Sequence, residues 1–185
     1  VFTDHIFGGN PLAVFPQGQE FNEEDLQKVA REMNLSETTF VYPPTTNEAD
    51  YDVRIFTPTR EIPFAGHPSL GAAYVLRKYG SATADTLRLN FKAGIIPVSI
   101  EGDKIFMQHP PAQTLHELSP SKTIAEALGI PLRGLDENLS IKVVSTGFPA
   151  LFTPVKSLNF INERSINFQT LNEVLDPLGI DMIYP

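Results

Sequence analysis

A spacing pattern that occurs twice is the strongest constraint on the fold of this 185-residue chain. A glycine and two prolines of a turn recur 138 residues later: Gly9, Pro11 and Pro16 match Gly147, Pro149 and Pro154. The amphipathic helix expected after each turn recurs at an offset of 145: Asn22, Leu26, Val29, Ala30 and Met33 match Asn167, Leu171, Val174, Leu175 and Leu178. Such spacing predicts duplication of one unit, with seven residues inserted in the second copy. The alternative is chance recurrence of glycine, proline and amphipathic periods.

The stretch from His109 to Ser121 divides the chain, because three prolines interrupt its periodicity and predict a linker. We therefore expect a first domain over residues 1–112 and a second over residues 113–185. The second-copy counterpart of His67 would fall beyond Pro185. The second domain is accordingly expected to be incomplete in this chain.

Composition excludes several classes of function. The formal net charge of −8, without a run of Lys and Arg, argues against a nucleic-acid partner. No apolar run approaches the roughly 18 residues of a membrane span, so we expect no membrane partner and a cytoplasmic location. Cysteine is absent, which excludes disulfides and thiolate nucleophiles. The histidines show no metal-ligand spacing and no nucleotide-binding glycine motif is present, so we expect neither metal nor cofactor.

The first half of the chain predicts an α+β fold. Asn22 is a suitable N-cap for a helix that reaches Met33, and a second helix should run from Pro68 to Gly80. Period-two patterns and bounding prolines or glycines predict the strands, which are expected over 12–15, 38–42, 51–56, 87–91, 95–100 and 105–108. In the second half, a short helix over 123–128 and a strand over 141–144 precede the repeated turn.

The helix that begins at Pro68 has the features of an anion site. Small residues follow it, so other parts of the backbone can pack closely against the helix. Free N–H groups and the positive end of the helix dipole would converge near Gly66, His67 and Ser69. This arrangement predicts binding of a small molecule that carries a carboxylate or phosphate.

Glu37 is the candidate for proton transfer, because it lies between an expected helix and an apolar strand. A carboxylate in a partly dry cleft has a raised pKa and can take a proton from carbon and return it elsewhere. The alternative is a solvated carboxylate at the start of a strand. Asn10 could likewise reach a ligand or only build its turn.

Four motifs carry a family resemblance, in the order 7–15, 33–40, 54–58 and 65–68. They resemble the phenazine-biosynthesis PhzF-like isomerase family, most strongly over residues 1–110. The family is similar in fold to diaminopimelate epimerase, which implies two pseudo-symmetric domains, each a curved mixed sheet wrapped around a central helix. The helix from Pro68 would be the central helix of the first domain.

The resemblance implies that Glu37 is the acid/base, with His67 as a second catalytic or carboxylate-orienting group. Gly66, Ser69 and Asn10 would bind the substrate; serine at position 69, where the family usually has threonine, keeps the hydroxyl. A two-cysteine epimerase is disfavoured, since His67 stands where the first thiol would be. We expect a cofactor-free isomerase that moves a proton between carbons of a small carboxylate such as dihydro-hydroxyanthranilate, and a homodimer. The alternative is a non-catalytic small-carboxylate-binding protein of the same fold.

Overall fold

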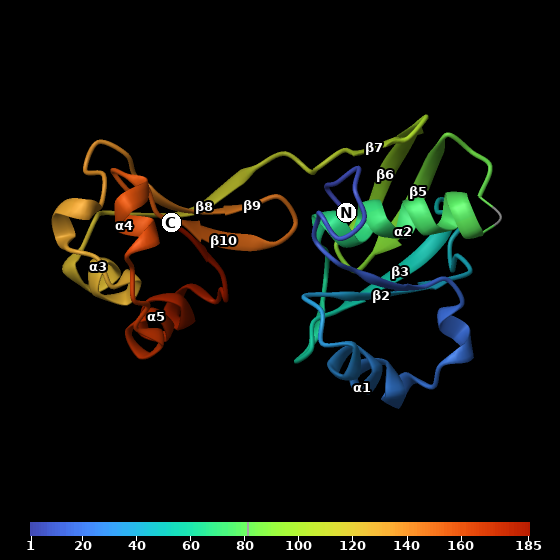
Figure 1. Cartoon of the computed structure of the whole chain (residues 1–185), viewed down its shortest axis with the longest axis horizontal. Coiled ribbons are helices and arrows are strands. Elements are labelled where there is room, and N and C mark those ends of the chain that lie inside the picture. The colour runs from blue at the N-terminus through green and yellow to red at the C-terminus, as the bar shows by residue number, and fades with distance from the viewer. Residues whose placement is uncertain (81) are drawn as a thin grey trace. The chain divides into compact units, whose positions relative to one another are not determined.

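The computed structural model describes residues 1–80 and 82–185, which form two compact units (Figure 1). Unit 1 is Val1–His109 and unit 2 is Pro110–Pro185. Within the described residues, every helix falls short of the length and apolarity that crossing a membrane requires. The elements of unit 1 are β1 (Ala13–Phe15), a 3-10 turn (Gly18–Glu20), α1 (Glu23–Met33), β2 (Thr38–Tyr42), β3 (Tyr51–Phe56), β4 (Glu61–Ile62), α2 (Gly66–Tyr79), β5 (Thr86–Phe91), β6 (Gly94–Glu101) and β7 (Lys104–Met107).

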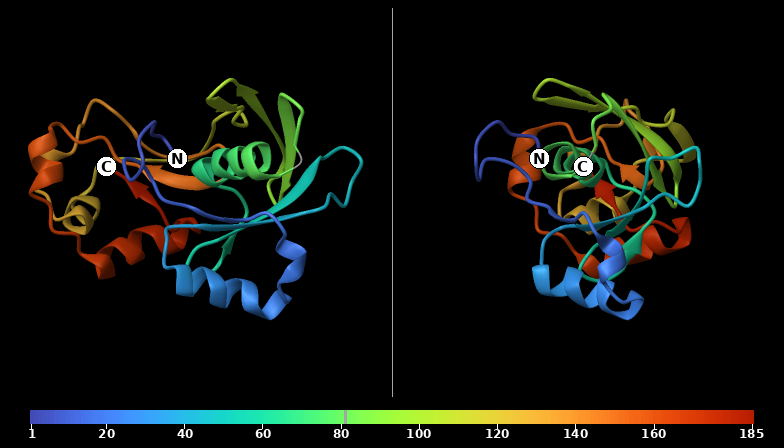
Figure 2. Two further views of the ribbon diagram at one scale, coloured as in Figure 1. Left: turned by 45° about the vertical axis from the view of Figure 1, so that its right-hand side comes forward. Right: turned by 90° about the vertical axis from the view of Figure 1, so that its right-hand side faces the viewer.

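The sheet of unit 1 is mixed and curved. Its strands run in the order β1-β2-β3-β5-β6-β7, and β4 pairs with β3. The pairs β1–β2 and β3–β5 are parallel, whereas the other pairs are antiparallel. Strands β1 and β2 at one edge and β6 and β7 at the other all contact α2. The sheet therefore curls around this helix, which Figure 2 shows in green beside its strands.

Helix α2 can occupy the centre because its sequence is small and apolar. Gly71, Ala72 and Ala73 are buried, and a side chain at Gly71 would clash with the end of Leu12. The helix begins at Gly66, two residues before the predicted start, and ends before Gly80 as predicted. The earlier start is compatible with Pro68, because N–H groups of the first helical turn have no acceptor within the helix.

Helix α1 covers the other face of the sheet at the β1–β2 edge. Its buried Leu26 and Ala30 pack in a cluster with Phe40 and Phe56, and the rings of Phe15 and Phe40 stack at 5.1 Å. The helix has the predicted bounds, and its C-cap Asn34 adopts a left-handed conformation with φ of 50°. This cap turns the chain back into β2, where Glu37 immediately precedes the first strand residue.

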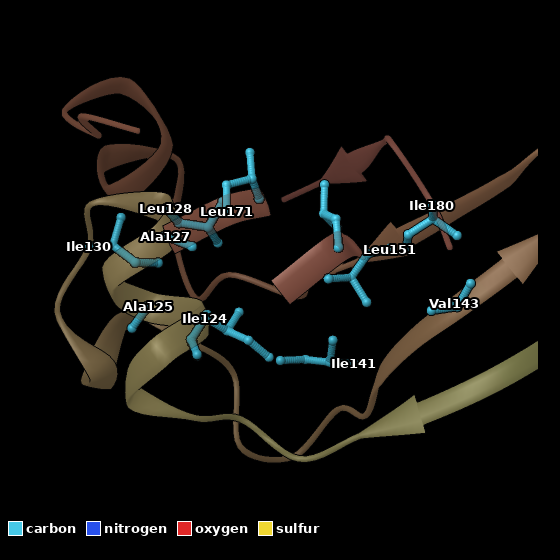
Figure 3. Packing of buried hydrophobic residues seen from close by; sticks show 12 residues of the cluster. Ile124, Ala125, Ala127, Leu128, Ile130, Ile141, Val143, Leu151, Leu171 and Ile180 are labelled. Carbon is cyan, nitrogen blue, oxygen red and sulfur yellow. The ribbon is translucent and has the colours of Figure 1, made fainter. Parts of the chain in front are cut away.

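Unit 2 is built on a second sheet, in the order β11-β10-β9-β8. One face of this sheet packs against two helices around buried residues that include Leu128, Val143, Leu151 and Leu171 (Figure 3). The elements are β8 (Gln113–Leu118), α3 (Lys122–Leu128), a 3-10 turn (Leu132–Gly134), β9 (Ile141–Ser145), β10 (Pro149–Phe152), α4 (Leu158–Asn162), α5 (Phe168–Leu175), a 3-10 turn (Asp176–Leu178) and β11 (Ile183–Tyr184).

The predicted linker over 109–121 is wrong in its central part, because Gln113–Leu118 forms β8 and pairs with β9. The strand is at the edge of the sheet, and all its residues except Leu118 are exposed. A register shift between Thr114 and His116 also breaks its alternation. An exposed, irregular edge strand therefore lacks the apolar period on which the prediction relied.

Strand pairing reproduces both offsets of the sequence repeat. In unit 1, Ala13 of β1 pairs in parallel with Thr38 of β2. In unit 2, Leu151 of β10 pairs in parallel with Ile183 of β11. Leu151 follows Ala13 by 138 residues and Ile183 follows Thr38 by 145. Each unit thus contains a strand, a helix and a parallel strand in matching register, and the predicted insertion in unit 2 accommodates α4.

Candidate functional site

The side chains of Glu37 and His67 lie next to each other at the centre of the candidate site, although they are 30 positions apart in the sequence. Glu37 immediately precedes β2, and His67 is the second residue of α2. Glu37 Oε2 lies 3.2 Å from His67 Nε2, and the side chains are 18% and 9% exposed. Among the described residues, neither atom has an aligned hydrogen-bond partner. The pair is therefore close enough to exchange a proton, and a ligand would meet it through the part of the Glu37 side chain that stays exposed.

Burial controls the charge of His67. Removal of the imidazole from water lowers its pKa from the usual 6.5, and the Glu37 carboxylate opposes this by favouring the charged form. The α-amino group of Val1 lowers the pKa further, whereas the Pro11 carbonyl raises it. The net direction is downward, so at neutral pH the pair is a neutral imidazole beside a carboxyl group.

The first turn of α2 offers backbone donors. Its N-cap residue, Ala65, supplies no side-chain cap, and Pro68 has no N–H. The N–H groups of Gly66 and His67 lie in the turn where helices leave donors unpaired. The positive end of the helix dipole adds to their attraction for an anion. A carboxylate is the group that this turn would hold.

The Ser69 hydroxyl makes a hydrogen bond within the first turn of α2. The hydroxyl is buried and donates a hydrogen bond of 2.8 Å to the carbonyl of Ala65. This hydrogen bond links the N-cap residue of α2 to the first turn of the helix. Ser69 therefore helps to hold the donors of Gly66 and His67 in place, and its predicted contact with a substrate stays a prediction.

Asn10 builds the N-terminal turn through its backbone. Its N–H donates to the carbonyl of Val1, and the Val1 α-amino group donates to the carbonyl of Asn10, both at 2.9 Å. Its side chain is exposed and makes no hydrogen bond among the described residues. The turn-building interpretation thus accounts for what the structure shows of Asn10.

The structure adds Phe2 to the residues near this pair. Its ring centroid lies 6.5 Å from that of His67, at an interplanar angle of 52°. Sequence reasoning overlooked Phe2, because a single phenylalanine ahead of a turn carries no pattern. The contact depends on how the N-terminal loop folds back onto α2.

The comparisons with known proteins agree with this architecture. The family model for phenazine biosynthesis-like proteins matches residues 1–181. The chain belongs to this family. An uncharacterized isomerase of Pasteurella multocida is 37% identical over 90% of this chain and 57% of its own length. The trans-2,3-dihydro-3-hydroxyanthranilate isomerase of Pseudomonas aeruginosa is 42% identical over 70% of this chain and 47% of its own length.

Solved structures confirm the predicted diaminopimelate epimerase-like fold of this family member. A PhzF-family phenazine biosynthesis protein of Bacillus anthracis superimposes with a TM-score of 0.81 at 29% identity, over 96% of this chain and 60% of that one. A probable proline racemase of Agrobacterium radiobacter gives a TM-score of 0.55 at 10% identity, over 86% of this chain and 51% of that one, and shows the fold alone. The chain spans about half to three fifths of these proteins.

Proposed function

We propose that this protein is a cofactor-independent isomerase that moves a proton between two carbons of a small cyclic carboxylate. The observation that carries the proposal is the 3.2 Å contact between Glu37 Oε2 and His67 Nε2 beside the uncapped first turn of α2. Relatives named trans-2,3-dihydro-3-hydroxyanthranilate isomerase support this reaction class. We take that compound as the model substrate.

Glu37 would carry the proton. Its carboxylate takes a proton from one ring carbon, and the electrons of the broken C–H bond shift along the conjugated double bonds. The carboxyl group then returns the proton to a different ring carbon, where a new C–H bond forms. No oxidant or reductant is required, because substrate and product are isomers. A positioned acid/base of this kind contributes about 10²–10⁴-fold to a rate.

His67 and the first turn of α2 would position the substrate. Because its one N–H is donated to the Pro11 carbonyl, the neutral imidazole can accept a hydrogen bond from the substrate or from protonated Glu37 through Nε2 without adding a second charge. The N–H groups of Gly66 and His67 would hold the substrate carboxylate, and the Ser69–Ala65 hydrogen bond keeps their turn in place. Fixing the carboxylate places the ring carbons against Glu37.

Glu37→Gln is the direct test, with Glu32→Gln on the exposed surface of α1 as the matched control. The chain is incubated with trans-2,3-dihydro-3-hydroxyanthranilate in heavy water, and deuterium incorporation is followed by NMR. We expect Glu37→Gln to lose at least about a hundredfold in turnover, while Glu32→Gln keeps the wild-type rate. Turnover that survives in Glu37→Gln would refute the role of Glu37.

Binding without turnover by the wild-type chain would favour the alternative, a non-catalytic carboxylate-binding protein. Calorimetry with 3-hydroxyanthranilate, the aromatic analogue of the substrate, measures binding independently of chemistry. We also propose a homodimer, as expected from the family resemblance. Sedimentation equilibrium tests this part separately, and a monomer at all concentrations would contradict it.

A further inference from the structure

Phe2 is an exposed aromatic residue held in an unusual backbone conformation. Its φ of 62° lies in the left-handed region, which bulky side chains rarely adopt. The side chain is 71% exposed, so burial of the ring does not offset this strain. Backbone strain of this kind is concentrated at sites that bind ligands. The contacts of the Phe2 ring therefore bear on why this conformation occurs.

The ring of Phe2 lies near His67, and Phe2 also lines an open pocket. Its ring centroid is 6.5 Å from that of His67. The pocket has a volume of about 580 Å³ and is bounded by the N-terminal loop, by Leu70 and Tyr74 of α2 and by Phe106 of β7, and neither Glu37 nor His67 lines it. A ligand in contact with Glu37 and His67 therefore has an aromatic surface available beside it.

We propose that Phe2 is a substrate-binding residue whose ring packs against the flat conjugated diene of the substrate ring. This inference rests on the proposed function, since it assumes that the substrate binds at the Glu37–His67 pair. Phe2 has no group that can transfer a proton. It therefore affects the affinity for the substrate and the selectivity between flat and puckered ring compounds. Planar rings gain from contact with an aromatic face, whereas a puckered saturated ring fits it less closely.

Binding of two probes to three variants tests this role. The probes are 3-hydroxyanthranilate, which is planar, and cyclohexanecarboxylate, which is puckered. Phe2→Leu removes the aromatic ring but keeps an apolar side chain, and Phe2→Tyr keeps the ring. Phe168→Leu is the matched control, because Phe168 is 70% exposed, nearly as much as Phe2, and lies in α5 of unit 2. Thermal melts of each variant verify folding.

We expect Phe2→Leu to weaken 3-hydroxyanthranilate binding about three- to tenfold and to change cyclohexanecarboxylate binding much less. Phe2→Tyr should restore affinity, and Phe168→Leu should bind as wild type. With substrate, Phe2→Leu should raise KM while kcat is little changed. Wild-type affinity in Phe2→Leu, an equal loss in Phe168→Leu, or no binding of 3-hydroxyanthranilate to the wild-type chain would each overturn the proposal. Intact binding without turnover would count against the proposed isomerase alone.

Discussion

Glu37 Oε2 lies 3.2 Å from His67 Nε2, and the contact joins the start of β2 to the first turn of α2. Both atoms are buried, and neither has an aligned hydrogen-bond partner among the described residues. Such an arrangement costs stability unless a ligand or a proton shared by the pair compensates for it. It is therefore a feature that function explains better than folding does.

Stability should rise with pH through the titration of His67. In the unfolded chain the imidazole binds a proton below pH 6.5, whereas the lowered pKa of the folded state delays protonation to a lower pH. Between the two pKa values the unfolded state holds more protons, so the free energy of unfolding increases with pH and levels off above 6.5. Urea unfolding at intervals between about pH 5 and 8 measures this slope.

His67→Asn supplies the comparison, because it removes the titrating group and should flatten the slope over that range. His116→Asn, at an exposed position of β8, is the matched control. Glu37 and the Val1 α-amino group also affect the pKa of His67. The carboxyl groups of Asp50 and Glu61 have lowered pKa values, so they titrate below the pH range of the experiment. Equal slopes in wild type and His67→Asn would show that His67 is not the source.

A second prediction concerns Arg54, which connects two carboxylates. Its guanidinium donates to Glu61 Oε1 and Oε2 at 2.8 and 2.9 Å and to Glu23 Oε1 at 2.8 Å. Glu61 is only 14% exposed and also accepts from Lys92 at 2.6 Å. Arg54→Met removes one of the partners of the partly buried Glu61 carboxylate. We therefore expect the free energy of unfolding to fall by about 2–3 kcal/mol.

Arg88 is the matched control for Arg54, because it also pairs with a carboxylate, that of Asp50, from the neighbouring strand β5. This pair is more exposed, so Arg88→Met should destabilise less than Arg54→Met. Chemical denaturation of both variants under one set of conditions makes the comparison. A larger loss in Arg88→Met would contradict our account of the Arg54 network.

The sequence predicted much of the fold, because local signals are strong in several places. Helix α1 has its N-cap, acidic first turn and apolar face in order, and its predicted bounds agree with the structure. The repeat offsets of 138 and 145 residues are also the distances that separate the paired Ala13 and Thr38 of unit 1 from the paired Leu151 and Ile183 of unit 2. Strand β8 escaped prediction, since an exposed edge strand does not need apolar alternation.

The candidate site was predictable residue by residue but not as an arrangement. Glu37 and His67 each have local features that indicate chemistry, and the family motifs contain both. Their 3.2 Å contact depends on the sheet curling around α2, which no local pattern encodes. The hydrogen bond from Ser69 to Ala65 and the conformation of Phe2 are also products of the folded backbone.

A third prediction compares two left-handed glycines of unit 2. Gly129 caps α3 with φ of 67°, and a side chain there would clash with the backbone of Ser165. Gly179 has φ of 64°, but a Cβ there would meet no described atom within 4 Å. Gly179→Ala should cost about 1 kcal/mol of stability from backbone strain alone. Gly129→Ala should cost about 3 kcal/mol or more, because the clash adds to the strain.

Thermal and urea unfolding of both alanine variants distinguish the two effects, and equal losses would mean that the Ser165 clash is relieved cheaply. Gly179→Asn offers a check on the repeat. Asn34, 145 residues earlier, holds the equivalent helix end in the left-handed conformation. Asparagine tolerates this conformation, so Gly179→Asn should be milder than Gly179→Ala.

The last prediction uses the two faces of β10. Leu151 is fully buried and points into the core of unit 2, whereas the adjacent Phe152 is 44% exposed and stacks on Tyr184 with ring centroids 5.3 Å apart. Leu151→Ala should lower the free energy of unfolding by about 2–5 kcal/mol, because it leaves a cavity. Phe152→Ala should cost only about 1 kcal/mol, because the ring is half in water already. Urea melts of the two variants measure the difference, and a greater loss in Phe152→Ala would show that its face of the sheet is covered in solution.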